Sequence, residues 1–291
     1  MDERVDVLIP TCNRATALAV TLTALASQQP VLRIVISDQS NDLHVVDAPE
    51  LHGVLRYLRH LGHTVEVHRH WPRRGMAEQR AFLLAQARSA ICLFIDDDVI
   101  TRAGLVAQMK DLLLREACGF VGSALHGLSH ADDHRPHEEA IAFWEHGVCP
   151  ETVTPDSDAW QRHRLHNAAN LLHVQQRLGL SPLMHPSMAQ PVPQTSPELV
   201  SRPYRVAWVG GCVMYDTAKL RDCGGFDFWE ALPADHCGED VLAQLRVMAK
   251  YGGCGLVPSG AYHLELPTTL PDRRVNAPMA LGLTQAGKCL E

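Results

Sequence analysis

Long apolar runs are missing from this sequence of 291 residues, and their absence argues against a membrane-spanning protein. No apolar run approaches the ~18 residues that a transmembrane helix needs. The first residues, Met1-Asp2-Glu3-Arg4, lack the apolar core of a signal peptide. The sequence therefore predicts a cytoplasmic protein without a membrane span, and it leaves peripheral membrane contact open.

Paired cysteine motifs and an excess of basic residues are missing as well. The nine cysteines are an odd number, scattered without a Cys-x-x-Cys pair. Such a distribution is typical of buried thiols in a reducing compartment. Acidic residues outnumber basic residues by 33 to 26, and the formal net charge is −7. Because this balance disfavours sequence-independent binding of polyanions, we expect no nucleic-acid partner.

Strand and helix patterns alternate through the first third of the chain. Residues 5–9, 33–37, 65–68 and 91–95 predict strands, of which the first and fourth are apolar segments, and helical patterns follow the first, third and fourth of them. Alternating β and α segments predict a parallel sheet covered by helices on both faces, with right-handed crossovers. The expected fold class is therefore α/β, with a Rossmann-like, mostly parallel central sheet flanked by helices.

The regular alternation weakens after residue 124. We expect four segments, which are a first half of the sheet domain at 1–124, an insertion at 125–200, a second half of the same domain at 201–267, and a C-terminal tail at 268–291. The insertion is rich in histidine, proline and polar residues, so irregular structure with helical pieces near 159–178 is expected, as a lid or an acceptor-binding segment. Strands at 206–209 and 212–215 are expected to resume the core.

Three consecutive aspartates, Asp96, Asp97 and Asp98, follow the apolar segment 91–95. In an α/β sheet, ligands gather at the C-terminal ends of the strands. Adjacent carboxylates repel one another unless a cation joins them, so this cluster suggests a divalent metal and, with it, a phosphate. The alternative is a solvated turn in which Asp98 caps a helix that begins near Thr101.

A second acidic site, Gly238-Glu239-Asp240, begins a predicted helix. Acidic residues are common in a first helical turn, so capping alone would explain them. The helix dipole would also keep such a carboxylate ionised near neutral pH, which is the state that a general base needs. His263 follows a predicted strand and a turn. A lone histidine there is usually packed or exposed, but next to three carboxylates it becomes a candidate metal ligand.

The order of these motifs resembles family 2 glycosyltransferases of the GT-A fold. The motifs that carry the resemblance are Pro10-Thr11-Cys12-Asn13-Arg14, the Asp38 loop, Gly75-x-x-x-x-Arg80, Asp96-x-Asp98, Gly210-Gly211, Gly224-Gly225-Phe226-Asp227, Gly238-Glu239-Asp240 and His263. A single Asp-x-Asp motif is common, but this ordered spacing on predicted strand ends is hard to obtain by chance. The resemblance implies metal-dependent, inverting, non-processive transfer of a sugar from a nucleotide-sugar, expected to be a UDP-sugar, to a saccharide, lipid-linked or other hydroxyl acceptor.

The resemblance also implies a donor pocket near the nucleotide. Its members are Pro10, Thr11, Asn13, Arg14, Asp38, Arg74, Arg80, Asp96, Asp97, Gly210 and Gly211. In this pocket Asp38 would accept from the imino group of a uracil base, and Arg80 would reach the base or the diphosphate. Asp96 would hold the ribose or a metal-bound water, whereas Asp97 is a bystander beside it. The two glycines would let the backbone approach the donor sugar.

The implied cofactor is Mn²⁺ or Mg²⁺. Asp98 would bind the ion directly, His263 would complete the protein's share of the coordination sphere, and Asp96 would lie close to it. The ion would neutralise the charge that develops on the departing diphosphate. Asp240 is the preferred candidate for the base that deprotonates the acceptor hydroxyl, and Glu239 would support the site; which of the two is the base stays open.

Some features depart from the family pattern, and they concern the acceptor. The asparagine expected before Gly75 is replaced by Arg73-Arg74, from which Arg74 would add a phosphate or base contact. No QxxRW-like motif occurs, which disfavours a processive synthase. We expect the insertion, Trp208 and the aromatic stretch 228–230 to shape the acceptor site, although core packing is the commoner fate of a single tryptophan.

Two other classes of function stay open. A nucleotidyltransferase of sugar-nucleotide metabolism also uses a parallel sheet and Mg²⁺-binding carboxylates, but residues 10–14 lack its glycine-rich basic loop. A non-catalytic nucleotide-sugar-binding module would keep the fold without turnover. The retained Asp98, Asp240 and His263 argue against such a module.

Overall fold

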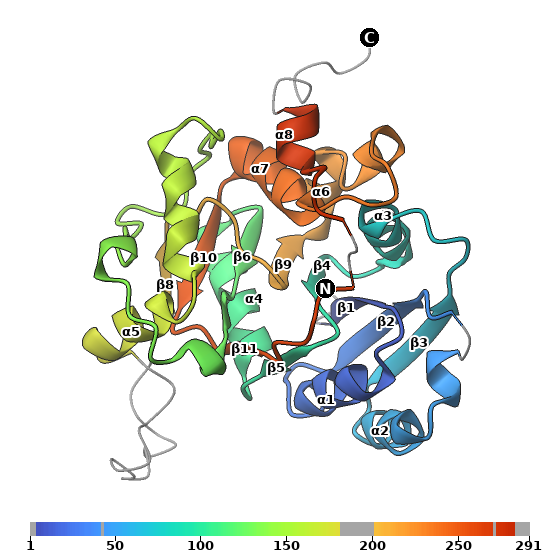
Figure 1. The fold of residues 1–291 in the computed structure, drawn as a ribbon. Coiled ribbons are helices and arrows are strands. Elements are labelled where there is room, and N and C mark those ends of the chain that lie inside the picture. The colour runs from blue at the N-terminus through green and yellow to red at the C-terminus, as the bar shows by residue number, and fades with distance from the viewer. Residues whose placement is uncertain (1–3, 42–43, 181–200, 270–271, 283–291) are drawn as a thin grey trace.

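The protein folds around one large sheet and one small sheet (Figure 1). The computed structural model describes residues 4–41, 44–180, 201–269 and 272–282. The large sheet has eight strands in the order β3 (Thr64–Arg69), β2 (Leu32–Asp38), β1 (Val5–Thr11), β4 (Ile91–Ile95), β9 (Cys212–Asp216), β6 (Phe120–Gly122), β10 (Gly253–Val257) and β8 (Arg202–Tyr204). Only β9 and β8 run antiparallel to their neighbours. The predicted α/β class with a mostly parallel sheet is confirmed.

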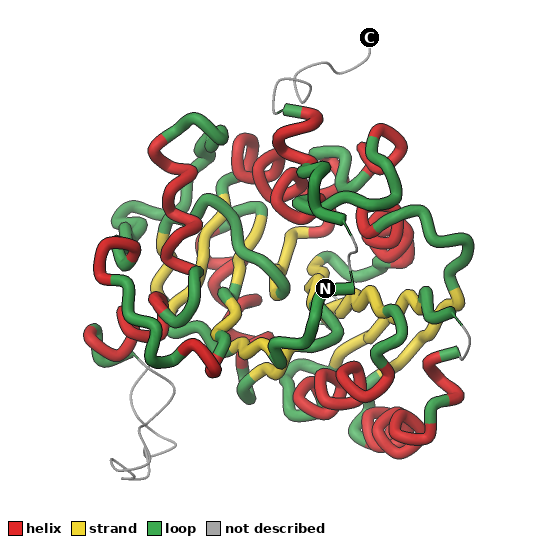
Figure 2. The backbone as a smooth tube through the Cα atoms, viewed as in Figure 1, coloured by secondary structure: helices red, strands yellow, loops and turns green. Residues whose placement is uncertain are grey.

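Helices cover both faces of the large sheet, which forms a central layer in Figure 2. The α-helices are α1 (Ala15–Leu25), α2 (Pro49–His60), α3 (Met76–Gln86), α4 (Leu105–Glu116), α5 (Asn170–Arg177), α6 (Thr217–Asp222), α7 (Glu239–Tyr251) and α8 (Ala277–Leu281). Short 3-10 helices lie at Val45–Asp47, Leu128–His130, Pro136–Glu138, Asp158–His166 and Asp227–Ala231. In the part of the chain that the structure describes, no helix has the length and apolar character to span a bilayer.

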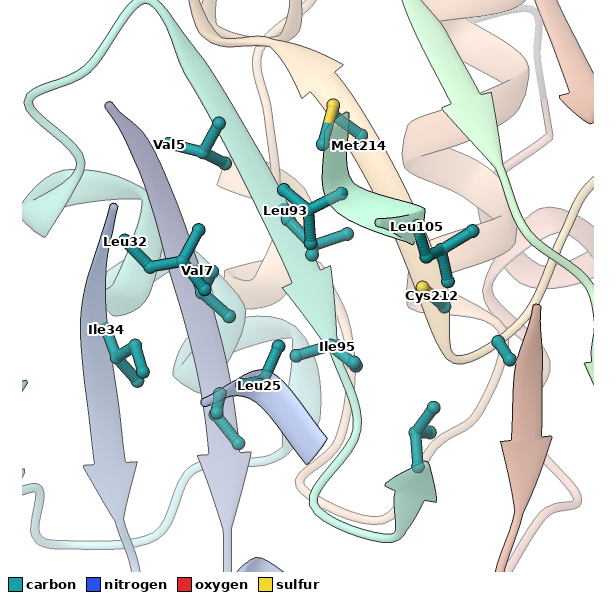
Figure 3. Packing of buried hydrophobic residues seen from close by; sticks show 14 of the residues in the cluster. Val5, Val7, Leu25, Leu32, Ile34, Leu93, Ile95, Leu105, Cys212 and Met214 are labelled. Carbon is teal, nitrogen blue, oxygen red and sulfur yellow. The ribbon is translucent and has the colours of Figure 1, made fainter. Parts of the chain in front are cut away.

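The two faces of the sheet belong to two separate apolar cores. Successive side chains of a strand point to opposite faces, so Val7 packs with α1, α2 and α4, whereas Leu8 packs with α3, α6 and α7. The residues labelled in Figure 3 show the first core, and they are Val5, Val7, Leu25, Leu32, Ile34, Leu93, Ile95, Leu105, Cys212 and Met214. Each fully buried aliphatic side chain contributes ~1.5–3 kcal/mol relative to an exposed one. These cores make the strand ends a rigid platform for the loops that follow them.

The small sheet brings the later histidine to the aspartate cluster. Its order is β5 (Val99–Thr101), β11 (Ala261–His263) and β7 (Leu125–His126). Strand β11 runs antiparallel to β5 and places His263 opposite Val99. The next backbone group continues the pairing, because the Leu264 amide donates to the Asp98 carbonyl at 2.9 Å. Residues far apart in sequence therefore meet at one position.

Two sequence predictions about elements need correction. The strand predicted at 206–209 is wrong, because the strand lies at β8 and the backbone of Val209 is paired with the side chain of Gln244 rather than with another strand. The alternative of a helix cap at Asp98 is also wrong, because residues after it form β5 and the helix begins at Leu105. The part of the predicted insertion at 181–200 lies outside the described residues.

Candidate active site

Loops at the C-terminal ends of β1 and β4 enclose a cavity of about 710 Å³ together with the beginnings of α3 and α7 and the segment after β11. The sequence-predicted residues that line it are Pro10, Thr11, Arg14, Arg80, Asp96, Asp97, Asp98, Glu239, Asp240 and His263. Asp98, Asp240 and His263 thus face one common cavity, as the sequence predicts. The volume lies within the range of ligand pockets for molecules of nucleotide-sugar size.

Asp98 forms an ion pair with Arg14 and a hydrogen bond with His263. Its Oδ2 lies 2.8 Å from Nη1 of Arg14 and 3.3 Å from Nε2 of His263. Burial raises the pKa of Asp98, but the hydrogen bond from His263 and the charges of both partners outweigh it and hold this pKa below its ordinary value. The same hydrogen bond raises the pKa of His263. Asp98 is therefore an ionised carboxylate that already has two cationic or donor partners.

Asp97 is an anchor of the loop rather than a free carboxylate. The Thr11 hydroxyl donates to its Oδ2 at 2.6 Å, Nη1 of Arg14 lies 3.3 Å from its Oδ1, and the Thr21 hydroxyl donates to its carbonyl oxygen at 2.9 Å. Burial raises the pKa of Asp97 to about 6, against the lowering effect of the Thr11 hydrogen bond and of Arg14. These contacts fix the loop so that its neighbours Asp96 and Asp98 are oriented.

Arg80 joins the first aspartate to the acidic helix start. Its Nη2 lies 3.1 Å from Oδ1 of Asp96, and its Nε donates to Oε1 of Glu239 at 2.9 Å. The Arg80 side chain is only 7% exposed, whereas that of Asp96 is 35% exposed and open to the cavity. Both acidic partners raise the pKa of Arg80 against the effect of burial, so it stays a cation. Its predicted contact with the nucleotide stays a prediction.

Asp240 has the electrostatic setting of a proton acceptor. It begins α7 beside Glu239, and its Oδ1 accepts only a local hydrogen bond, from the Val241 amide at 2.9 Å, among the hydrogen bonds of the described residues. Burial and the neighbouring charge of Glu239 raise the pKa of Asp240 to about 7, although Arg80 lowers it. Glu239 is instead buried and ion-paired with Arg80. The two carboxylates are adjacent in sequence but differ in availability.

Asn13, Asp38 and Arg74 lie outside the cavity lining. Asp38 is fully buried, and its two oxygens accept hydrogen bonds from the amides of Ser40 and Val45, each at 2.8 Å. Asn13 has a positive φ of 57° and accepts from the Asn41 amide at 2.8 Å, so it joins two loops. The exposed Arg74 guanidinium lies 5.9 Å from the ring centroid of Trp229. Their predicted nucleotide contacts stay predictions.

The paired glycines differ from each other. Gly211 has a φ of +72°, and a Cβ there would lie 2.3 Å from Cδ1 of Leu125. Its carbonyl also accepts from the Asp96 amide at 3.0 Å, so the glycine helps to place that aspartate. A Cβ at Gly210 would meet no described atom within 4 Å. No described protein atom therefore requires a glycine at position 210. The predicted approach of this backbone to a donor sugar stays a prediction.

Several cavity residues were not predicted as donor-site or metal residues. The lining also includes Arg73, Gln79, Cys237, Arg273 and Asn276. Arg73 precedes the predicted Arg74, so of this pair Arg73 lines the cavity, whereas the predicted ligand contact of Arg74 stays a prediction. Arg273 and Asn276 belong to the predicted tail, where no periodic or motif signal marks them.

Asp98 and His263 could hold a divalent ion only after two of their present contacts are released. Among the described residues, no group of three or more His, Cys, Asp or Glu side chains is arranged to hold a metal. Asp98 and His263 offer an oxygen and a nitrogen, a donor pair that Mn²⁺ accepts when water or phosphate oxygens supply the rest. Arg14, however, occupies the same Oδ2, and Nδ1 of His263 accepts from the Glu265 amide at 2.9 Å, which leaves the proton on Nε2. The oxygen of Asp98 and the nitrogen of His263 are suitable ligands for the ion once both contacts are released.

Comparison with known proteins identifies relatives of this fold. The model of the family "Glycosyl transferase family 2" matches residues 6–175. A structure of S. aureus TarS 1-349 has a TM-score of 0.54 and 15% identity, with 89% of this chain and 60% of that chain covered. The same protein in complex with UDP-GlcNAc has a TM-score of 0.52 and 13% identity, with 92% and 60% covered. This chain thus spans about 60% of the length of these structures, and at such identities the likeness shows the fold alone. None of the curated proteins matches.

Proposed function

Because this chain belongs to glycosyl transferase family 2 and is a glycosyltransferase of the GT-A fold, we propose that it transfers single sugars from a UDP-sugar to an acceptor hydroxyl with inversion at the anomeric carbon. The observation that carries this proposal is the meeting of Asp98, His263 and Asp240 at one cavity. The fold is also one that TarS uses in a complex with UDP-GlcNAc, which supports a UDP-sugar as the donor.

The proposed reaction exchanges one bond of the anomeric carbon for another. The bond from this carbon to the diphosphate breaks, a bond to the acceptor oxygen forms on the opposite face, and the hydroxyl proton leaves for a base. A divalent ion, Mn²⁺ or Mg²⁺, held by Asp98 and His263 would supply positive charge for the departing diphosphate. Arg14 and Arg80 contribute two permanent cations to the same region, because neither guanidinium is deprotonated in proteins.

Asp240 is the residue that we propose as the base. Its pKa of about 7 leaves a substantial ionised fraction near neutral pH while it retains the basicity to accept a proton. Glu239 suits this role less well, because Arg80 holds its carboxylate at 2.9 Å. We assign Glu239 and Arg80 to positioning, since together they join the start of α7 to Asp96.

Release of UDP tests the proposed function against both alternatives. The protein is incubated with Mn²⁺ and a panel of UDP-sugars, and UDP is quantified. We expect UDP from one or a few donors, and Asp240→Asn should retain UDP binding while losing ~100-fold or more of the rate. Pyrophosphate formed from a nucleoside triphosphate would point to a nucleotidyltransferase instead. Binding of a UDP-sugar without any turnover would point to a binding module.

We also propose a cytoplasmic location. The eight cysteines of the described residues are free thiols, and four of them, Cys92, Cys118, Cys212 and Cys254, are buried. Such thiols suit a reducing compartment. Burial raises the pKa of Cys92 and Cys212 to about 12, so these two are unreactive parts of the core.

A further inference from the structure

Trp208 occupies a part of the cavity that the donor-pocket residues leave unexplained. It lies in the loop between β8 and β9 and lines the same cavity as Asp240 and Val241. The side chain is half-buried, so part of the indole is open. Trp208 therefore packs against the second apolar core and lines the cavity as well.

Two rings of the predicted insertion hold this indole in place. The His163 ring is stacked on Trp208, with ring centroids 4.8 Å apart and an interplanar angle of 11°. The Trp160 ring centroid lies 4.5 Å from that of Trp208. The His163 ring is itself fixed, because its Nδ1 lies 2.7 Å from the Trp160 carbonyl oxygen. Neither supporting ring lines the cavity, so of the three rings Trp208 is the one that a ligand there could contact.

Gln244 joins this indole to the proposed base. Its side chain is fully buried, and its Oε1 accepts from the Val209 amide at 2.8 Å. Its Nε2 donates to the Val209 carbonyl at 2.8 Å and to the Asp240 carbonyl at 3.2 Å. Because Val209 follows Trp208 and Asp240 lies in the first turn of α7, one side-chain amide joins the backbone next to the indole to the backbone of the proposed base.

A cavity that an indole and a proposed base line together suits one class of acceptor. The C–H face of a sugar ring is apolar and can lie against an aromatic ring, while its hydroxyl groups stay at the ring edge for hydrogen bonding. We propose that the acceptor is a pyranose ring that rests on Trp208 with one hydroxyl directed at Asp240, and that Gln244 is the positioning residue that sets their relative place. This inference rests on the proposed glycosyl transfer, in which the hydroxyl proton passes to Asp240 and UDP leaves.

The test compares cyclic and open-chain acceptors. With the donor found by UDP release, methyl α- and β-D-pyranosides are added in one series, and glycerol or ribitol at equal concentration in another. We expect pyranosides to accelerate UDP release above the rate of donor hydrolysis and to yield a disaccharide glycoside by mass spectrometry. Equal acceleration by glycerol and ribitol would overturn the assignment of a sugar ring.

Variants of the aromatic wall sharpen the test. Trp208→Ala should raise KM for the pyranoside by about tenfold or more, while Trp208→Phe should retain most of the affinity. An unchanged Tm in both variants would show that the altered KM does not come from a general loss of structure. Trp71→Ala is the matched control, because Trp71 is 47% exposed and lies outside the cavity lining. An unchanged KM in Trp208→Ala would overturn the inference.

Gln244 is tested by the nearly isosteric Gln244→Leu. We expect a higher pyranoside KM with an unchanged donor affinity, because the variant shifts Trp208 relative to Asp240. If this variant does not fold, Trp208→Ala still decides the inference.

Different outcomes would contradict the proposed function and the acceptor inference. No UDP release from any donor would sink the proposed function, whereas donor hydrolysis without any pyranoside effect would sink the acceptor inference alone.

Discussion

Asp240 determines the pH dependence expected of the reaction. Burial and the charge of Glu239 raise its pKa to about 7, and a base acts only when it is deprotonated. The raised value means that the active form is lost as pH falls through neutrality. We therefore expect kcat/KM to increase about tenfold per pH unit below pH ~7 and to level off above it. A profile measured with saturating metal checks this, and a flat profile down to pH ~5 would contradict the role of Asp240.

Arg14 should compete with the metal for Asp98. Its guanidinium lies 2.8 Å from the oxygen that also faces His263, so an ion must displace it. Arg14→Gln removes this competitor and a positive charge, and we expect Mn²⁺ binding without nucleotide to strengthen by about tenfold, as a lost charged hydrogen bond implies. Electron paramagnetic resonance of free Mn²⁺ measures the change.

A second arginine serves as the control for charge. Arg73 lines the same cavity, and neither Asp97 nor Asp98 is among its ion-pair or hydrogen-bond partners in the described residues. Arg73→Gln should therefore strengthen Mn²⁺ binding much less than Arg14→Gln. Equal effects would mean that net charge alone is responsible, and weaker binding in Arg14→Gln would contradict the competition.

Single residues were predictable from sequence where they follow a strong local pattern. Asp98 lies three residues after the apolar strand β4, and Asp240 is the second residue of the amphipathic helix α7, so both were placed at element ends. The partners of these residues were not predictable, because the bond from Arg14 to Asp98 joins positions 84 apart in the chain. Asp38 shows the same limit, since the conformation of its own loop determines that Ser40 and Val45 use its oxygens.

At the scale of elements, the Gly210-Gly211 junction before β9 offers a matched pair of substitutions. Gly211→Ala places a Cβ at a φ of +72° and 2.3 Å from Leu125, so we expect a loss of ~1–3 kcal/mol in the free energy of unfolding. Gly210→Ala adds a Cβ in open space and should change it by less than ~0.5 kcal/mol. Urea denaturation measures both. Equal destabilisation would contradict the assigned constraint at Gly211.

Elements were predicted well where apolar periodicity alone builds them. The first four predicted strands correspond to β1, β2, β3 and β4, because each is a short segment rich in β-branched residues. The region before Gly210 misled the prediction, since Val206 and Val209 are apolar and buried like a strand. What makes it a loop is the pairing of Val209 with the distant Gln244, and a strand pattern does not show such a partner.

At the scale of the whole molecule, ligand binding should be visible as stability. UDP and Mn²⁺ together, each at ~100 times its Kd, should stabilise the folded state by ~5 kcal/mol and raise Tm by about 9 °C. A chelator should remove the metal-dependent part of this shift. Asp98→Asn should lose the same part while the shift with UDP alone is retained. Thermal unfolding is measured with UDP and Mn²⁺, with UDP alone, with added chelator, and for Asp98→Asn. An undiminished shift in Asp98→Asn would contradict the metal assignment.

The fold class was predictable from the sequence, whereas the strand order and the segment that completes the cavity were not. Alternating strand and helix patterns predict a covered parallel sheet, because parallel strands need crossover connections. The order of strands across the sheet was not specified by the sequence, and neither was the return of residues 264–269 and 272–276 to the cavity. Leu266, Thr268, Thr269, Arg273 and Asn276 line the site from a stretch without periodic pattern.

The contact of Arg14 with the Pro267 carbonyl limits how far the chain can be shortened at its C-terminal side. The family match ends at residue 175, yet the arginine of its first motif is secured by a residue 253 positions downstream. A protein shortened after residue 263 would keep every motif of the resemblance and still lack one side of its own binding chamber. Homology boundaries would therefore be a poor guide to trimming this chain for crystallisation or assay.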